Sequence, residues 1–148
     1  MENHTSTTRK YPDAPRPAVG AVVFKGDAVL LVQRGNSPSR GMWAIPGGSI
    51  RLGETFQAAA EREIIEETGV VIRAGEPVFV FDVIQQNDRG EVKYHYVIVD
   101  LAADYVSGEP RAGDDAADAR WITEDELARL TVNPATRRLL AEKFNFGK

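Results

Sequence analysis

Acidic side chains at regular spacings between residues 54 and 67 give this chain its clearest capacity for chemistry. If residues 55–68 form a helix, Glu63, Glu66 and Glu67 share one face, because residues three and four positions apart are helix neighbours. Carboxylate oxygens at this density are the ligands that Mg²⁺ and Mn²⁺ prefer. The spacing therefore predicts a divalent-metal site on one helix face.

Apolar residues of the same helix share the face with these glutamates. Phe56, Ala59 and Ala60 fall on it, whereas a purely structural helix places its glutamates opposite its apolar stripe. Three anions beside a core are costly unless a cation compensates them. The pattern favours a cation-binding role over the alternative of a solvated acidic helix.

The stretch from residue 48 to residue 70 resembles the sequence box of the Nudix hydrolase family, G-x5-E-x7-R-E-U-x-E-E-x-G-U, in which U is a bulky aliphatic residue. Every fixed position is filled, by Gly48, Glu54, Arg62, Glu63, Ile64, Glu66, Glu67, Gly69 and Val70. Outside these 23 residues the resemblance rests on small size and strand order. It implies an α/β enzyme with the Nudix-type α/β/α sandwich around a mixed central sheet.

The resemblance also implies a set of metal ligands. Glu63, Glu66 and Glu67 are expected to bind Mg²⁺, with Mn²⁺ as the alternative, and the backbone carbonyl of Gly47 is expected to help. The pair formed by Gly47 and Gly48 is open to two interpretations, a simple turn or a close approach of the backbone to the helix and metal. Its position beside the box favours the second.

Two further residues of the box are expected to act in catalysis together with the three glutamates. Arg62 would hold Glu63 by an ion pair, and Glu54 would assist metal binding or position the attacking water. The general base stays open, because relatives use either a helix glutamate or an acid on a distant loop. In the loop 112–120, Asp114 and Asp115 are candidates for contact with water or substrate, against the alternative of a solvated acidic loop.

Contacts to the rest of a substrate are predicted from single residues. Arg34 precedes the loop 35–41 and Arg40 lies within it; both are candidates for binding substrate phosphate, with ordinary exposed arginines as the alternative. His95 is interpreted as a packed strand histidine rather than a contact to ribose or phosphate. Aromatic residues expected in the core, with base stacking as the alternative for one of them, are Trp43, Phe79, Phe81, Tyr94 and Tyr96.

Periodicity and turn residues predict the elements that position these groups. Strands are expected at 18–25, 28–34, 43–45, 78–86, 92–101 and 119–122, and helices at 55–68, 123–130 and from 134 onward. Strands 78–86 and 92–101 are apolar on both faces and are expected to be central and well covered. This order predicts a mixed sheet with helices on both sides.

Length and composition set the class of protein. The 148 residues predict an extended segment at 1–16 and one Nudix hydrolase domain at 17–148. The absence of cysteine, of a long apolar run and of a leader-like N-terminus favours a cytoplasmic protein that does not bind membranes. A net charge of −4 without a basic excess argues against nucleic-acid binding. The proline-rich entry and the resemblance together favour a homodimer.

The predicted reaction is metal-dependent hydrolysis of the pyrophosphate linkage in a nucleoside diphosphate joined to a second group, X. ADP-ribose is the favoured substrate, because YPDAPRPAVGAVV and GDDAADARWI resemble segments of the small ADP-ribose pyrophosphatases. The chain lacks the proline that many such enzymes carry near the position of Gln86. The alternatives are a nucleoside triphosphate pyrophosphohydrolase that sanitises the nucleotide pool and, more remotely, a non-catalytic nucleotide or ADP-ribose sensor.

Overall fold

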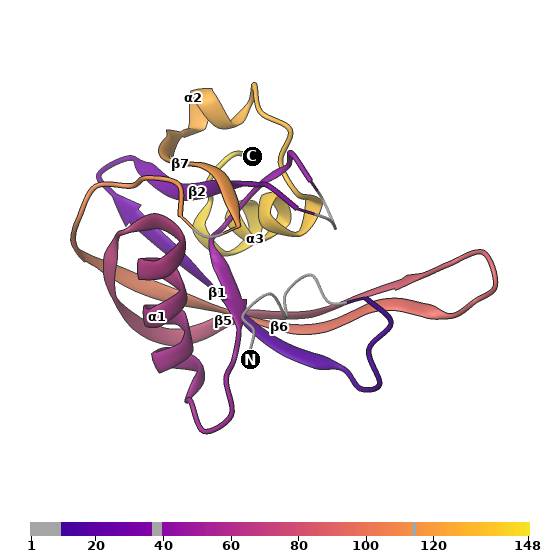
Figure 1. Cartoon of the computed structure of the whole chain (residues 1–148). Helices are drawn as coiled ribbons and strands as arrows, with labels where there is room; N and C mark the ends of the chain where they lie inside the picture. Colours follow the sequence, from indigo (N-terminus) through magenta and orange to yellow (C-terminus); the bar gives the residue numbers. More distant parts are fainter. Residues whose placement is uncertain (1–9, 37–39, 114) are drawn as a thin grey trace.

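The computed structural model of the chain describes residues 10–36, 40–113 and 115–148. Its centre is a mixed sheet whose main path runs β3-β2-β1-β6-β5, with β4 paired to β1 and β7 paired to β2 (Figure 1). The strands are β1 (Arg16–Lys25), β2 (Ala28–Arg34), β3 (Trp43–Ala44), β4 (Gly47–Ser49), β5 (Val71–Gln86), β6 (Val92–Ser107) and β7 (Ala116–Thr123). The helices are α1 (Phe56–Thr68), α2 (Glu124–Leu127) and α3 (Pro134–Phe144).

Strand β1 lies at the middle of the sheet and sets the register of its neighbours. Gly26, with a φ of 62°, makes the tight turn that pairs β1 antiparallel with β2. On one side Gly20 of β1 lies opposite Gly47 of β4, and on the other side it lies opposite Asp100 of the parallel strand β6. Residues far apart in the sequence are thereby brought to the two sides of Gly20.

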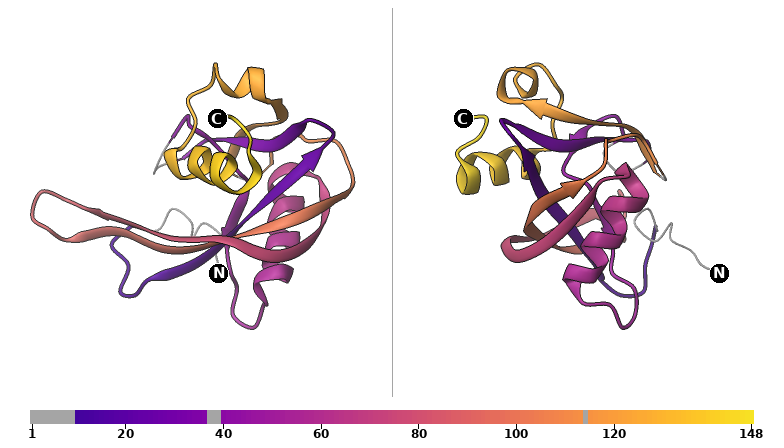
Figure 2. Two further views of the ribbon diagram at one scale, coloured as in Figure 1. Left: turned by 180° about the vertical axis from the view of Figure 1, so that it is seen from behind. Right: turned by 90° about the vertical axis from the view of Figure 1, so that its left-hand side faces the viewer.

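Helices α1 and α3 cover opposite faces of the sheet (Figure 2). Val22 of β1 packs in one core with Leu139 and Leu140 of α3. Its neighbour Val23 points to the other face, because side chains alternate along a strand, and packs with Ile64 of α1. The predicted fold class, a mixed sheet with helices on both sides, is confirmed.

Strands β5 and β6 form a long hairpin whose far end projects from the body of the protein (Figure 1). The prediction that both strands are central and well covered is wrong for β5, which ends the main strand path. Val80 and Ile84 of β5 are 62% and 51% exposed. Apolar composition predicts a strand correctly here, but it does not tell whether a second layer covers that strand.

Several strand ends differ from the predicted ones. β1 begins at Arg16 instead of Ala18, and β7 begins at Ala116. β5 begins at Val71 instead of residue 78, and β6 ends at Ser107 instead of residue 101. The two strands pair over these added residues as far as Val71 and Ser107, so each provides the hydrogen-bonding partners of the other. Gly47 and Gly48, predicted as a turn or a close backbone approach, belong to strand β4, which pairs with β1.

The C-terminal helices are capped by side chains at their first residues. Thr123 and Glu126 form a capping box at the start of α2, and Asn133 accepts a hydrogen bond from the Ala135 N–H at the start of α3. Helix α2 is shorter than predicted and ends at Leu127. The short helix and its turn lead α3 to the sheet face opposite α1.

The N-terminal segment is described only from residue 10. Tyr11 donates its backbone N–H to the carbonyl of Lys93 at 2.8 Å, so the segment runs beside the projecting hairpin. The prediction of an extended segment at 1–16 and its role in a homodimer stay predictions. In the described part of the chain, no helix has the length and apolar character needed to cross a membrane.

Candidate metal and substrate site

Helix α1 is held at both ends by its own caps. The Thr55 side chain accepts a hydrogen bond from the Ala58 N–H at 3.1 Å, and Gly69, with a φ of 78°, ends the helix in the left-handed conformation. Ala59 is fully buried against the sheet, as predicted, whereas Phe56 is 36% exposed and lies outside the buried face. The caps and the buried alanines fix where the glutamates of α1 lie.

Arg62 of α1 is the centre of an ion-pair network that links the helix to Glu54 and to β4. It forms two hydrogen bonds with Glu54, at 2.6 and 2.9 Å, and it contacts Glu63 at 2.9 Å and Glu66 at 3.1 Å. It also donates to the backbone carbonyl of Ser49 at 3.0 Å. The predicted pair with Glu63 is present, and the clamp on Glu54 and β4 adds an anchoring role that the sequence did not suggest.

Glu67 has different surroundings from the other glutamates. It is 7% exposed and accepts a hydrogen bond from the Gly47 N–H at 3.0 Å. Burial raises its pKa to about 8, although the Gly47 N–H favours the charged form. Burial also raises the pKa of Glu63, whereas the hydrogen bond from Arg62 lowers the pKa of Glu54. The site thus contains a buried carboxyl that is costly to ionise without a cation.

The two glycines before the helix are required by close packing. A side chain at position 48 would overlap the carboxylate of Glu63, and one at position 47 would overlap the backbone carbonyl of Val19. Gly48 therefore forms the cradle in which the Glu63 carboxylate lies. This supports the predicted close approach of the backbone to the helix.

The donor set on this face fits a divalent cation. Glu63, Glu66 and Glu67 carry carboxylate oxygens of the hard kind that such a cation prefers, and the Gly47 backbone adjoins Glu67. Within the described ranges, no three acidic or histidine side chains converge as a complete ligand cage. Glu63 and Glu66 instead share Arg62 as their partner, and Glu67 accepts from the Gly47 N–H, so the positive charge of Arg62 offsets the repulsion between the first two.

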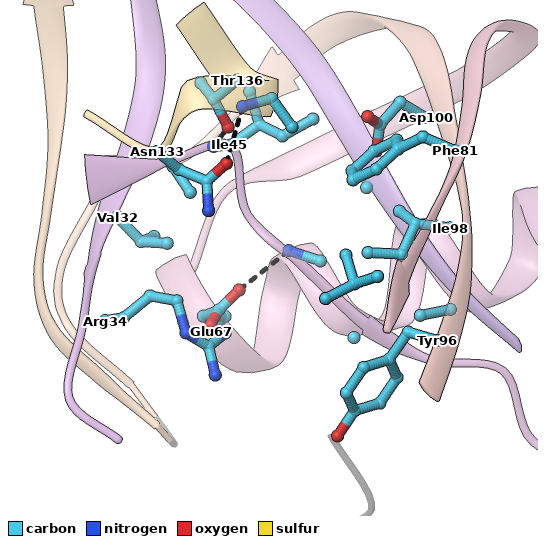
Figure 3. A pocket seen from close by; sticks show the side chains of 17 residues that line it. Val32, Arg34, Ile45, Glu67, Phe81, Tyr96, Ile98, Asp100, Asn133 and Thr136 are labelled. Carbon is cyan, nitrogen blue, oxygen red and sulfur yellow. Dashed lines mark hydrogen bonds between the residues drawn. The ribbon is translucent and has the colours of Figure 1, made fainter. Parts of the chain in front are cut away.

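A pocket extends from this acidic face across the sheet towards α3 (Figure 3). Arg34 and Glu67 lie at one end of the view, and Asp100 and Phe81 at the other. The remaining side chains of the wall that Figure 3 labels are Val32, Ile45, Tyr96, Ile98, Asn133 and Thr136. Most of this wall is apolar, with charged groups at its two ends.

A family model for the NUDIX domain matches residues 14–143 of the chain. The chain belongs to the Nudix hydrolase family. It is 34% identical over 119 residues to a Methanocaldococcus jannaschii ADP-ribose pyrophosphatase, covering 80% of this chain and 68% of that protein. It is also 34% identical over 128 residues to a Mycobacterium tuberculosis protein provisionally named 8-oxo-dGTP diphosphatase 2, covering 84% of each.

Solved structures agree with this family assignment. The crystal structure of a MutT NUDIX hydrolase from Burkholderia pseudomallei has a TM-score of 0.69 and 29% identity, covering 88% of this chain and 99% of that one. The NUDIX domain of Shewanella oneidensis NrtR, solved with ADP ribose, has a TM-score of 0.71 and 24% identity, covering 90% and 89%. The protein is therefore an enzyme of the Nudix hydrolase type with the Nudix fold, and enzymes of this family generally need divalent metal ions.

The substrate residues predicted for this Nudix hydrolase are only partly brought together. Arg34 lines the pocket, and Asp115 lies beside it, because the Asp115 carbonyl accepts from the Gly35 N–H at 3.0 Å. Arg34 lowers and Asp115 raises the pKa of Glu67, so both charges act on the acidic face. Arg40 is exposed and does not belong to the pocket wall as described, and Asp114 lies outside the described residues.

The loop that carries Asp115 is fastened to the end of α1 by backbone groups. The N–H of Arg111 donates to the carbonyl of Thr68, and the N–H of Gly113 to that of Glu67, both at 2.9 Å. A side chain at position 113 would overlap the backbone carbonyl of Glu66. These contacts bring the loop beside Glu67, and they do not depend on charged side chains.

Sequence reasoning missed three polar residues of the pocket, Asp100, Asn133 and Thr136. Asp100 could have been noticed as an acid inside an otherwise apolar strand, whereas Asn133 and Thr136 read as ordinary helix-start residues. Of the five aromatic candidates, Phe81 and Tyr96 line the pocket, and the other three are not part of its described wall. The alternative of base stacking therefore stays a prediction for Phe81 and Tyr96.

Magnesium binding to the metal-free protein should tighten as the pH rises. The proton on Glu67 must leave before the carboxylate can bind a cation, and its pKa is raised to about 8. Below that pH, affinity should rise by about tenfold per pH unit through this group. Calorimetric titration with Mg²⁺ at a series of pH values measures this dependence of the affinity on pH. The Glu67→Gln variant should lose most of the pH dependence, and an affinity that is constant below about pH 8 would contradict the assignment.

Proposed function

We propose that this Nudix hydrolase cleaves the pyrophosphate linkage of a nucleoside diphosphate joined to a second group, that ADP-ribose is its substrate, and that Mg²⁺ is its cofactor. The observation that carries the proposal is the pocket that joins the acidic face at Glu67 to an apolar wall around Ile45, Phe81 and Ile98. Such a pocket suits a ligand with phosphates at one end and a nucleoside at the other. The 34% identity to the Methanocaldococcus jannaschii ADP-ribose pyrophosphatase supports the same function.

In this proposal Glu63, Glu66 and Glu67 would hold the cation, helped by the Gly47 carbonyl. The bound ion would neutralise phosphate charge and favour deprotonation of the attacking water. Arg62 acts as a positioning residue, because its hydrogen bonds orient Glu63 and Glu54. Glu54 accepts hydrogen bonds from the Arg62 side chain and from the Arg51 N–H, which favours a supporting role over direct contact with substrate.

Arg34 and Asp115 are proposed to act at the phosphate end of the pocket. Arg34 offers a planar cationic group beside Glu67, which suits a phosphate oxygen. The Asp115 carboxylate accepts a hydrogen bond from the Asn36 side chain at 3.1 Å. Asn36 follows β2, so a residue of a neighbouring loop orients this carboxylate. It remains a candidate for the general base, together with a glutamate of α1.

ADP-ribose should be hydrolysed to AMP and ribose 5-phosphate with a higher kcat/KM than dGTP or 8-oxo-dGTP. The physical reason is that Arg34 is the only cationic side chain among the described residues of the pocket wall, which suits a diphosphate better than the higher negative charge of a triphosphate. Competition among the three substrates with Mg²⁺, with products separated by chromatography, decides between them. The control is the Glu67→Gln protein purified by the same procedure, because a contaminating phosphatase would be present in both samples.

Preference for a triphosphate with release of pyrophosphate would move this protein to the sanitising type. That alternative is favoured by its 34% identity to the protein named 8-oxo-dGTP diphosphatase 2. A non-catalytic sensor would not need an intact metal face, and all glutamates of the box are present. The homodimer, the cytoplasmic location and the absence of nucleic-acid and membrane partners stay predictions, the first of which sedimentation at high concentration tests.

A further inference from the structure

Asp100 is a buried carboxyl that the metal chemistry does not use. It is 3% exposed, and it lies on β6 in the wall of the pocket, away from Glu67 (Figure 3). The strand register sets it opposite Gly20 of β1 and Phe79 of β5. A side chain at position 20 would overlap the Asp100 carboxylate, so this glycine makes the room that the carboxyl occupies.

The Asp100 carboxyl has no partner in the part of the chain that the structure describes. No hydrogen bond or ion pair to it is found there, and burial alone raises its pKa, to about 7. An unpaired carboxyl in an apolar wall destabilises a fold, and leucine would fill similar space without that cost. A polar group supplied by a ligand would satisfy it.

The position of Asp100 decides which part of a nucleotide can reach it. In a nucleotide whose phosphates lie beside Arg34 and Glu67, the base is the part farthest from the phosphates. The apolar side chains of Ile45, Phe81 and Ile98 flank the route from one end to the other and suit the flat faces of a base. The group at the far end must therefore be the edge of a base that offers a hydrogen-bond donor.

Adenine offers such a donor in its exocyclic 6-amino group. In the same pocket wall the Thr136 hydroxyl accepts the Ile45 N–H at 3.3 Å and the Asn133 side-chain oxygen accepts the Ala135 N–H at 2.9 Å, whereas no donor to the Asp100 carboxyl is found among the described residues. We propose that Asp100 determines the base specificity of this enzyme by accepting a hydrogen bond from the 6-amino group of adenine. The proposal deepens the proposed function, because it takes the phosphate end of the pocket to be at Glu67.

A double-mutant cycle between protein and ligand tests the proposal. The ligands are AMP and purine riboside 5′-monophosphate, which lacks only the amino group, and their Kd values are measured by calorimetry without hydrolysis. In the wild type, loss of the amino group should weaken binding by roughly tenfold. In Asp100→Leu the two ligands should bind equally, whereas Asp100→Asn, which keeps a carbonyl acceptor, should retain the preference.

Asp104→Leu is the matched control, because it makes the same substitution at an exposed position farther along β6. It should keep the wild-type preference for AMP. If Asp100 has a purely structural role, Asp100→Leu should weaken the binding of both ligands by the same factor, and this result would overturn the proposal. So would a wild type that binds both ligands equally, a result that needs no variant to fold.

The same cycle separates this inference from the proposed function. If ADP-ribose is not hydrolysed but the preference for AMP depends on Asp100, the proposed substrate fails and the inference stands. If ADP-ribose is hydrolysed and the preference is unchanged in Asp100→Leu, the substrate stands and the inference fails. If both proposals hold, the kcat/KM of ADP-ribose should exceed that of its analogue without the 6-amino group by the same factor that separates the two Kd values.

Discussion

Replacement of Glu67 by glutamine should lower kcat by about two to three orders of magnitude while leaving the fold intact. Glutamine has nearly the same shape and can still accept the hydrogen bond from the Gly47 N–H, so the packing at the end of α1 is preserved. It cannot supply the negative charge that a divalent cation requires. Steady-state hydrolysis at limiting and at saturating Mg²⁺ measures the loss.

Glu61→Gln is the matched control for this variant. Glu61 lies on the same helix, but it accepts a hydrogen bond from the Ala74 N–H at 2.9 Å and is not part of the pocket wall. Its replacement should leave kcat within a few-fold of the wild type. Full activity of Glu67→Gln at limiting Mg²⁺ would remove Glu67 from the metal site.

The same substitution should stabilise the metal-free protein at high pH. The pKa of Glu67 is raised from 4.5 to about 8 in the folded state, so the folded protein keeps a proton that the unfolded chain has lost. Wild-type stability therefore falls as the pH rises from 4.5 to about 8, and glutamine, which does not titrate, avoids this loss. Urea unfolding in the presence of a chelator should show the advantage of the variant growing across that window and levelling above it.

Replacement of Arg62 by lysine should weaken Mg²⁺ binding by roughly 10- to 100-fold and lower stability by about 2 kcal/mol. Lysine keeps one positive charge but cannot reproduce the planar fork that contacts Glu54, Glu63 and the Ser49 carbonyl at once. Glu54 and Glu63 would then lose their common anchor. Calorimetric titration with Mg²⁺ and urea unfolding measure the two effects separately.

Arg138→Lys serves as the control for the Arg62 variant. Arg138 pairs with Glu142 at 3.2 Å on the exposed side of α3, far from the glutamates of the box. An exposed pair of this kind contributes little, so both Mg²⁺ affinity and stability should stay close to wild type. An Arg62→Lys protein with wild-type Mg²⁺ affinity would show that the ion-pair network does not position the ligands.

The local parts of the site are the ones that the sequence predicts well. The shared face of Glu63, Glu66 and Glu67 follows from helix geometry alone, and the caps at Thr55 and Gly69 follow from residue type. These features depend on contacts within a few positions along the chain. They are therefore readable without knowledge of the tertiary structure.

The missed parts depend on contacts between distant segments. Asp100 lies next to Gly20 only because β1 and β6 pair in parallel with one register, which no local pattern specifies. The same limit explains why Val80 and Ile84 were expected to be covered, because their burial depends on a second layer. Apolar composition describes a strand, whereas the neighbours of that strand are set by the whole fold.

The backbone attachment of residues 111–113 to α1 has a consequence for how this enzyme can change over evolutionary time. The anchoring hydrogen bonds come from main-chain groups that every residue except proline provides, and only Gly113 is constrained by contact with Glu66. Most side chains of this loop can therefore be exchanged by mutation while the end of α1 that carries Glu66 and Glu67 keeps its position. Single substitutions in this loop can therefore change which group X the enzyme accepts while the glutamates of α1 stay in place.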